Sequence, residues 1–211
     1  VLEAATAELL ERNGLRDAFV YWQVTRGTPL PGQPVRARGA PADTPPTAFA
    51  YAAPTPALEA CGEPVTTRLV TVEDRRWHRG QLKSISLLGN VLSAMESVER
   101  GATDALLVRD GLVGEACSTN VVLALPEGSG VRLVTPCLES VSILAGVTRA
   151  VLLDLMPEIE VRPVRVEEAT QASEIMLLGT LSMVMSVVEL DGRPVGEGKP
   201  GPAAKRMLET Y

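Results

Sequence analysis

The sequence predicts an α/β protein, and two observations lead to that prediction. Short runs rich in valine and leucine alternate with single segments of helical spacing, and turns rich in glycine, proline and aspartate separate them. The chain has 211 residues, of which 45% are hydrophobic, so it can bury a core as one domain or as one domain and a part. The proline-rich stretch from Pro29 to Pro46 is predicted to be an irregular loop.

The first part of the chain alternates between one helix and three strands. Residues 1–15 carry apolar residues on one side, and Glu8 precedes Arg12 by four residues, as in a helix. This pattern opens on Val1 without a methionine, so we expect a further segment upstream. Alternation and β-branched composition predict strands at 18–25, 49–53 and 65–72. The charged run from Glu73 to Arg76 is predicted to be a turn.

A second helix is predicted from Ile85 to Arg100, with Ser86 as its cap and Gly101 at its end. Its apolar stripe consists of Ile85, Leu88, Val91, Leu92, Met95 and Val98. Lys83 lies just ahead of this helix, where the partial positive charge of unpaired N–H groups disfavours a second cation. A neutral amine can attack a carbonyl, so Lys83 is a candidate nucleophile. A solvated lysine before a helix is the alternative.

Glu115 is the next candidate. It lies on the second of two predicted strands that meet at Asp110-Gly111, a dipeptide that favours a tight hairpin. Its neighbours are apolar or small, so the carboxylate is predicted to be buried and to need a cation or hydrogen bonds. The pyridinium nitrogen of a cofactor is one such cation, and a strand-edge glutamate in water is the alternative. Small hydrogen-bonding residues follow at Ser118, Thr119 and Asn120.

The rest of the chain adds two candidate anion sites. Further strands are predicted at 121–125, 131–135, 161–166, 175–178 and 184–190, and helices at 146–156, 167–173 and 199–211. The two candidate sites are Gly146-Val147-Thr148 at a helix start and Gly179-Thr180-Leu181 at a strand end. Free N–H groups and hydroxyls suit a phosphate in a chain without a P-loop motif, whereas an ordinary helix cap and a strand-end turn are the alternatives.

Composition excludes several classes of function. The net charge of -6 disfavours nucleic acid and anionic membranes as partners. Cys61, Cys117 and Cys137 lack metal-ligand spacing, so neither a metal site nor a disulfide framework is expected. The single histidine, His78, lies among charged residues and is predicted to be structural or solvent-exposed. No run of apolar residues is long enough to span a bilayer and no signal peptide opens the chain, so a cytoplasmic protein is expected.

Five runs in order, YWQVTRG, LKSISLLGNVL, GEACSTNV, ILAGVTR and GTLSMVMSVVELDG, resemble the fold type IV pyridoxal-phosphate enzymes. The resemblance is strongest to D-amino acid aminotransferases, in the superfamily that also contains branched-chain aminotransferases and aminodeoxychorismate lyases. It implies an α/β (α+β) fold with a large cofactor domain, made of a barrel-like sheet and helices. It also implies a small N-terminal domain that is mostly absent here. Residues 1–56 would be the end of the small domain and the loop, and residues 57–211 the large domain.

The resemblance also implies roles for single residues. Lys83 would bind pyridoxal 5'-phosphate as an aldimine (a Schiff base) and move the substrate's α-proton. Glu115 would pair with the ring nitrogen, and the residues at 118–120, 146–148 and 179–181 would hold the ring and the phosphate. Arg26, Arg36 and Arg38 are candidates for the substrate carboxylate, although relatives carry Arg-x-His where this chain has Arg36-Ala-Arg38. A homodimer with shared sites is implied.

The function implied is a transaminase that moves an amino group between a D-amino acid or (R)-amine and a 2-keto acid. A branched-chain L-amino acid aminotransferase or an aminodeoxychorismate lyase is the alternative on the same fold, because Gly179-Thr180 also occurs in branched-chain enzymes and Met183 replaces an acid frequent in D-specific ones. A noncatalytic, truncated relative is the alternative of another class.

Overall fold

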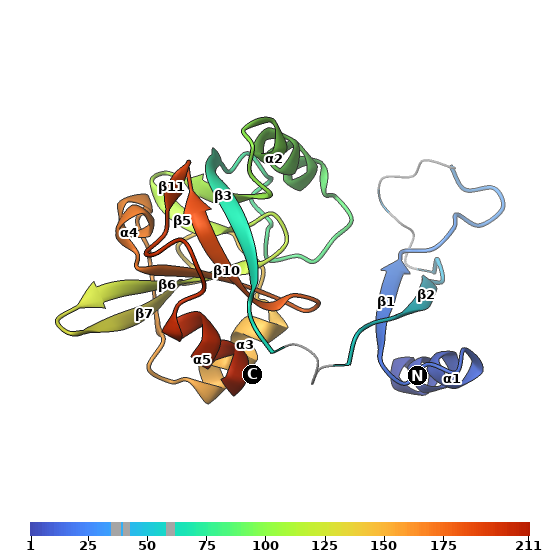
Figure 1. Cartoon of the computed structure of the whole chain (residues 1–211). Helices are drawn as coiled ribbons and strands as arrows, with labels where there is room; N and C mark the ends of the chain where they lie inside the picture. The colour runs from blue at the N-terminus through green and yellow to red at the C-terminus, as the bar shows by residue number, and fades with distance from the viewer. Residues whose placement is uncertain (35–38, 40–42, 58–61) are drawn as a thin grey trace. The chain divides into compact units, whose positions relative to one another are not determined.

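The computed structural model describes residues 1–34, 39, 43–57 and 62–211, which form two compact units, Val1–Gly62 and Glu63–Tyr211 (Figure 1). The candidate residues Arg36 and Arg38 lie outside the described residues. The domain boundary after residue 56 stays a prediction.

The first unit contains a helix and a two-stranded hairpin. Helix α1 spans Leu2–Arg12, and strands β1 (Ala18–Thr25) and β2 (Thr47–Pro54) lie where strands are predicted. The two strands pair antiparallel. Trp22 Nε1 donates to Thr6 Oγ1 at 3.0 Å, which fixes α1 on one face of the hairpin. The other face carries aromatic side chains, among them Tyr21 and Tyr51, whose rings stack with centroids 5.3 Å apart.

The second unit is built on one mixed sheet with the strand order β5-β4-β3-β10-β9-β6-β7-β8, and with β11 beside β10. The strands are β3 (Val65–Glu73), β4 (Asp104–Arg109), β5 (Leu112–Ala116), β6 (Asn120–Glu127), β7 (Gly130–Pro136), β8 (Glu160–Arg162), β9 (Glu174–Gly179), β10 (Met183–Leu190) and β11 (Arg193–Pro194). The turn between β4 and β5 has φ of 52° at Asp110 and 76° at Gly111, so the predicted tight hairpin is confirmed.

The sheet curls until its two ends meet. The backbone N–H of Val113 on β5 donates to the carbonyl of Val164, two residues beyond β8, at 2.8 Å. The N–H of Val166 donates in turn to the carbonyl of Gly111 at 3.0 Å. The predicted barrel-like sheet with helices is therefore confirmed.

Strand alternation divides the core into an inner layer and two outer layers. On β6, Val121 and Leu123 point into the curled sheet, whereas Val122 and Ala124 point outward under α3 (Val147–Leu155) and α5 (Pro202–Thr210). On β3, Val70 and Val72 belong to a smaller outer layer beneath α2 (Leu88–Glu99). Helix α4 (Val166–Gln171) contributes Ala169 to the inner layer.

Several predicted boundaries are wrong. Helix α2 begins at Leu88 instead of Ile85, and its N-cap is Leu87, without a side-chain cap, instead of Ser86. The predicted strand 161–166 ends at Arg162, because Pro163 has no N–H to donate to a neighbouring strand. The last helix begins at Pro202, where proline is favoured in the first turn.

The predicted turn from Glu73 to Arg76 is also wrong, because the alternation of buried and exposed side chains in β3 continues through this segment. Glu73 is the last residue of β3, and burial continues to alternate beyond it, with Val72, Asp74 and Arg76 buried and Glu73 and Arg75 exposed. The segment therefore carries two charged side chains into the protein. In the part of the chain that is described, no helix is both long and apolar enough to cross a membrane.

Candidate active site

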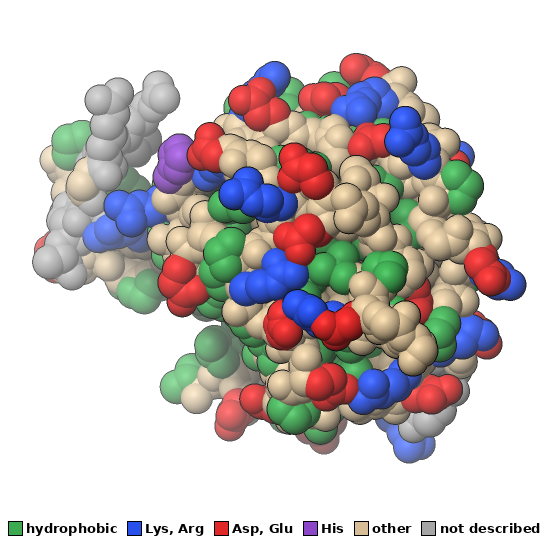
Figure 2. Space-filling model, turned by 90° about the vertical axis from the view of Figure 1, so that its left-hand side faces the viewer, with side chains coloured by type: hydrophobic (Ala, Val, Ile, Leu, Met, Phe, Trp, Pro, Cys, Tyr) green, Lys and Arg blue, Asp and Glu red, His purple; other side chains and the backbone are tan. Residues whose placement is uncertain are grey.

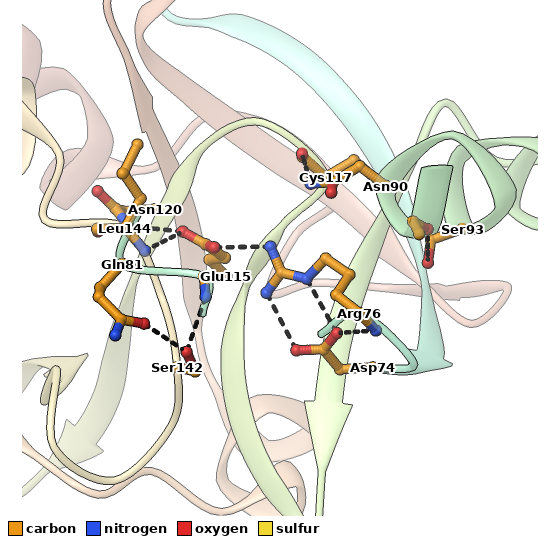
Figure 3. A network of polar contacts seen from close by, with 12 residues as sticks. Asp74, Arg76, Gln81, Asn90, Ser93, Glu115, Cys117, Asn120, Ser142 and Leu144 are labelled. Carbon is orange, nitrogen blue, oxygen red and sulfur yellow. Dashed lines mark hydrogen bonds and ion pairs between the residues drawn. The ribbon is translucent and has the colours of Figure 1, made fainter. Parts of the chain in front are cut away.

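Glu115 lies on β5 with its carboxylate buried, as predicted, at 5% exposure. Its Oε1 accepts a hydrogen bond of 2.8 Å from Arg76 Nη1. Its Oε2 accepts from Asn120 Nδ2 at 3.1 Å and from the backbone N–H of Leu144 at 3.2 Å (Figure 3). Three donors from three separate segments therefore fix both carboxylate oxygens.

Arg76 is itself held from the opposite side. Asp74 accepts from its Nε at 2.9 Å and from its Nη2 at 3.0 Å, so the guanidinium lies between two carboxylates (Figure 3). Arg109 Nη2 lies 3.2 Å from Asp74 Oδ1 and also donates to the carbonyl of Arg76 at 2.8 Å. The four charged groups, Glu115, Arg76, Asp74 and Arg109, alternate in sign and form one ionic network, in which the first three are buried and Arg109 is half-buried.

The ionisation of the two carboxylates differs. Burial raises the pKa of Glu115, and the charge and hydrogen bond of Arg76 offset only part of that rise. Burial also acts to raise the pKa of Asp74, but the hydrogen bonds and charge of Arg76, with the charge of Arg109, hold it below its ordinary value of 3.8. The guanidinium of Arg76 donates one hydrogen bond to Glu115 and two to Asp74. The charge of Glu115 is therefore less fully compensated than that of Asp74, and a further cation beside Glu115 would stabilise it.

Helix α2 packs closely against this ionic network, and the residues on its packed side are small. A methyl group on Gly89 would come within 2.8 Å of Arg76 Cγ, so only glycine lets the helix approach so closely. Ser93 and Ser97, at helical spacing from Gly89, are buried on the same side. Asn90 Nδ2 donates to the carbonyl of Cys117 at 2.7 Å. The first turns of α2 are thereby fixed over Arg76.

Lys83 lies on the segment between β3 and α2, and its side chain is exposed. That segment is connected to the Glu115 site. Gln81 Oε1 accepts a hydrogen bond of 2.9 Å from Ser142 Oγ, and two residues further Leu144 donates to Glu115 (Figure 3). One loop thus contacts both the approach to Lys83 and the buried carboxylate.

The other two lysines of the sequence are ion-paired. Lys199 Nζ lies 2.7 Å from Glu197, which raises the pKa of the amine, and Lys205 Nζ lies 3.2 Å from Glu63. Lys83 forms no ion pair with any residue that the structure describes. Within that part of the chain, it is therefore the lysine whose amine is not held by a carboxylate.

The first candidate anion site is the start of α3. Gly146 is the N-cap and no side chain caps the helix, so the N–H groups of its first turn lack a side-chain partner among the described residues. Thr148 is buried in that turn at 3% exposure, and the alternative that it is the N-cap is wrong. A methyl group on Gly146 would come within 2.0 Å of Asn120 Oδ1. The amide that holds Glu115 therefore lies directly against the start of this helix.

The second candidate anion site is the turn between β9 and β10. A methyl group on Gly179 would come within 2.8 Å of both Thr119 Cγ2 and Ser182 Oγ. Thr119 Oγ1 is buried and makes no hydrogen bond among the described residues. Met183 closes the turn with φ of 49°, a left-handed conformation that is uncommon for a residue other than glycine. Two consecutive residues, Thr119 just ahead of β6 and Asn120 at its first position, thus lie against the two candidate anion sites.

The remaining predicted residues lie more openly. Ser118, Val147, Thr180 and Leu181 are exposed at the edges of the two anion sites. Arg26 is exposed just beyond β1 in the first unit. The structure therefore brings Glu115, Thr119, Asn120 and the two glycine-containing sites together, and it leaves the predicted roles of Lys83 and Arg26 to be tested.

Sequence reasoning missed Asp74, Arg76 and Arg109. The available signal was the alternation of β3, which places Asp74 and Arg76 on the same side as Val72 if it is continued past Glu73. No comparable signal marks Arg109, which reaches the network from β4. The hydrogen bond from the N–H group of Leu144 to Glu115 was also missed, because the two residues lie far apart in the sequence.

Replacing Asp74 with Asn is expected to lower the free energy of unfolding by about 3 kcal/mol at pH 7, because Arg76 loses a buried counter-charge. The pKa of Asp74 is lowered in the folded chain, so its charge stabilises the fold above the ordinary carboxyl pKa of 3.8. That stabilisation is lost as the pH falls through the lowered pKa. Denaturant unfolding of both proteins between pH 7 and pH 2 measures the difference.

The matched control is Glu73→Gln, one residue away but exposed, which is expected to change the free energy of unfolding by less than about 0.5 kcal/mol. A difference between wild type and Asp74→Asn that stays constant over this pH range would show that the charge of Asp74 does not stabilise the network.

The chain is similar to known proteins over most of its length. The family model for amino-transferase class IV matches residues 1–190. The chain is 34% identical over 211 residues to D-alanine aminotransferase of Bacillus licheniformis, covering 98% of this chain and 70% of that protein. It is 33% identical over 152 residues to branched-chain-amino-acid aminotransferase-like protein 2 of Arabidopsis thaliana, covering 68% of this chain and 26% of that protein.

Among solved structures, a T.th. branched-chain amino acid aminotransferase superposes with a TM-score of 0.81 at 25% identity, over 100% of this chain and 68% of that one. That enzyme is complexed with N-(5'-phosphopyridoxyl)-L-glutamate. The family is shown by the match over residues 1–190 and by the 34% identity to a relative of which the chain covers 70%. The chain therefore belongs to the class IV aminotransferases, which are pyridoxal-phosphate-dependent enzymes of fold type IV that act on amino acids and keto acids.

Proposed function

We propose that this chain transfers an amino group between a D-amino acid or (R)-amine and a 2-keto acid, with pyridoxal phosphate held covalently by Lys83. The observation that carries the proposal is the buried carboxylate of Glu115 beside two glycine-containing anion sites. A buried carboxylate can pair with the ring nitrogen of the cofactor, and N–H groups and hydroxyls can bind its phosphate.

The residues present fit that cofactor. The uncapped first turn of α3 offers backbone N–H groups and Thr148 to a phosphate. Thr119 Oγ1 is a buried hydroxyl without a partner among the described residues, and a cofactor oxygen would satisfy it. Oε1 of Glu115 accepts one hydrogen bond, from Arg76, so it retains capacity for a ring N–H.

When bound, pyridoxal phosphate supplies an aldehyde and a pyridine ring that accepts electrons from the substrate's α-carbon. The protein supplies the proton chemistry. Once the amino group of the donor had displaced Lys83 from its covalent link, the free Nζ would take the proton from the donor's α-carbon, hold it, and give it up again later in the same half-reaction. Glu115 keeps a proton on the ring nitrogen, and Arg76, Asn120 and Leu144 hold its carboxylate still while it does so.

Substrate preference rests on other residues. Arg26, Arg36 and Arg38 are our candidates for the substrate carboxylate, since a guanidinium binds a carboxylate in bidentate fashion. A branched-chain L-amino acid aminotransferase is the second candidate, favoured by the similarity of the fold to the T.th. enzyme. A lyase acting on aminodeoxychorismate is a third candidate on the same fold.

Single-turnover reactions with the holoenzyme separate these functions. We expect D-alanine to bleach the visible absorbance of the lysine-bound cofactor at least about 100-fold faster than L-alanine or L-leucine, with (R)-phenylethylamine also active. Stopped-flow absorbance measures each rate. Bleaching by L-leucine alone would assign the chain to the branched-chain group.

A further inference from the structure

Asp74 lies across the Arg76 guanidinium from Glu115, so the two carboxylates share one cation. Arg76 donates to Asp74 through Nε at 2.9 Å and Nη2 at 3.0 Å, and to Glu115 through Nη1 at 2.8 Å (Figure 3). The backbone N–H of Arg76 also donates to Asp74 Oδ1 at 3.0 Å. The two acids are therefore separated by the width of a guanidinium, and a change in the charge of one acts on the other.

Burial distinguishes these two ion pairs from those at the surface. The side chains of Asp74, Arg76 and Glu115 are each at most 6% exposed, whereas in the pair of Arg162 and Glu168 both side chains are at least 28% exposed. Figure 2 shows one face of the surface, on which acidic and basic side chains are interspersed. Solvent screens such exposed charges, but it screens buried charges much less, so Asp74 can act on Glu115 through the protein.

We propose that Asp74 sets how tightly Glu115 holds a proton, because it balances the charge of the Arg76 guanidinium between them. A full positive charge beside Glu115 favours the carboxylate form and weakens its hold on a proton. Asp74 offsets part of that charge, so Glu115 holds a proton more tightly than it would beside Arg76 alone. Asp74 acts through Arg76 and is therefore a positioning residue.

The other groups that bind Glu115 carry no charge. Asn120 donates through its side-chain amide and Leu144 through its backbone N–H. Burial raises the pKa of Cys117, two residues further along the chain, to about 12, so its thiol is uncharged at neutral pH. Burial raises the pKa of Glu115 itself, and the charge of Asp74 acts in the same direction. Among the described residues, the charges that act on Glu115 most directly are therefore those of the ionic network.

Strand β4 contributes the remaining charges near this network. Arg109, at the end of the strand, lies 3.2 Å from Asp74 Oδ1, and its Nη1 lies 3.2 Å from Nδ1 of the exposed His78. Asp104 lies at the opposite end of the strand. Three charged groups, Arg109, Asp74 and Arg76, therefore separate His78 from Glu115, so a change in the charge of His78 acts first on Arg109.

Replacing Asp74 with Asn separates this electrostatic role from a merely structural one, because the two roles predict opposite changes. If Asp74 balances the guanidinium, Asn leaves the full charge of Arg76 acting on Glu115, and Glu115 holds a proton less tightly. If Asp74 only holds Arg76 in place, Asn frees the guanidinium to leave Glu115, and the buried Glu115 holds a proton more tightly. The direction of the change therefore identifies the role.

The test is a pH titration of the full chain without cofactor, followed by the carboxyl ¹³C signal of Glu115, which Glu115→Gln assigns. We expect the acid dissociation constant of Glu115 to rise at least about threefold in Asp74→Asn. The matched control is Glu73→Gln, which removes an exposed carboxylate one residue away and should leave that constant unchanged. Thermal unfolding over the same pH range checks that each variant is folded.

A second comparison serves if Asp74→Asn alone does not fold. In an Arg76→Gln background the buried cation is absent, so removing the charge of Asp74 leaves no guanidinium uncompensated there. Adding Asp74→Asn to this background should again raise the acid dissociation constant of Glu115, because the negative charge is lost. A purely structural Asp74 would have no guanidinium left to hold, and the constant would stay the same.

The consequence for catalysis rests on the proposed function, in which Glu115 keeps a proton on the ring nitrogen. With ¹⁵N-labelled pyridoxal phosphate bound, the ¹⁵N signal should show that the ring nitrogen loses its proton at a lower pH in Asp74→Asn than in wild type. An acid dissociation constant of Glu115 that falls or stays unchanged in Asp74→Asn would overturn the inference. A constant that rises while the ring nitrogen titrates as in wild type would support the inference and contradict the role of Glu115 in the proposed function, so the two failures are distinguishable.

Discussion

Replacing Lys83 with Ala is expected to abolish transamination and to remove the visible absorbance of the lysine-bound cofactor. Lys83 has two tasks in the proposed function, covalent attachment of the cofactor and movement of the α-proton, so activity should fall by more than about 10⁴-fold. We expect pyridoxal phosphate still to bind this variant through the candidate anion sites, but without a covalent link to the protein. Absorbance spectra and steady-state rates measure both effects.

The matched control is Lys199→Ala. Lys199 is ion-paired with Glu197 on the surface, and its loss should leave the spectrum and the rate unchanged. The sequence has only three lysines, so Lys205→Ala is the second control, and it too should leave the spectrum and the rate unchanged. A visible band that survives in Lys83→Ala would assign the covalent link to another lysine and remove Lys83 from the mechanism.

Replacing Glu115 with Gln is expected to leave the cofactor bound and to slow proton abstraction about 100- to 1,000-fold. Glutamine retains the size of the side chain and an acceptor oxygen for Arg76, but it has no charge to keep a proton on the ring nitrogen. A ring without that proton would accept electrons from the α-carbon less readily, so the α-proton would be removed more slowly. The rate of bleaching by D-alanine, compared with that of α-deuterated D-alanine, isolates this step.

Glu73→Gln is the control for this variant, because it removes a carboxylate from the same ion-rich part of the protein at an exposed position. An unchanged bleaching rate in Glu115→Gln would exclude Glu115 from catalysis. Its buried carboxylate would then serve only to neutralise Arg76.

The sequence predicted those parts of the site that depend on local rules. The hairpin at Asp110-Gly111 follows from residues that accept positive φ, and the burial of Glu115 follows from its apolar neighbours on β5. The glycines at 146 and 179 were the basis for predicting the two candidate anion sites, which stay predictions, and the structure shows a further reason for a glycine at each position. Each leaves room for a neighbouring side chain, Asn120 or Thr119.

Contacts between distant segments could not be predicted in this way. The pairing of Arg76 with Glu115 joins residues 39 positions apart, and the closure of the sheet depends on Val164, which follows a proline. The stripe of α2 was predicted correctly as a pattern, but periodicity identifies an apolar side of a helix without saying what covers it. The small residues Gly89, Ser93 and Ser97 decide that the stripe faces outward.

Some expectations stay predictions. These are the cytoplasmic location, the substrate-binding arginines and the domain boundary after residue 56. Testing Arg26, Arg36 and Arg38 by single replacement with Lys would show which of them binds the substrate carboxylate, since lysine keeps the charge and loses the bidentate geometry. A raised KM for all amino acids, with the spectrum of the bound cofactor unchanged, would identify that arginine.

The covalent role of Lys83 can be tested by reducing the holoenzyme with borohydride, digesting it and locating the phosphopyridoxyl group by mass spectrometry. We expect the group on Nζ of Lys83 and on neither of the other two lysines. A label on Lys199 or Lys205, or no label on a protein that shows the visible band, would contradict the proposed function.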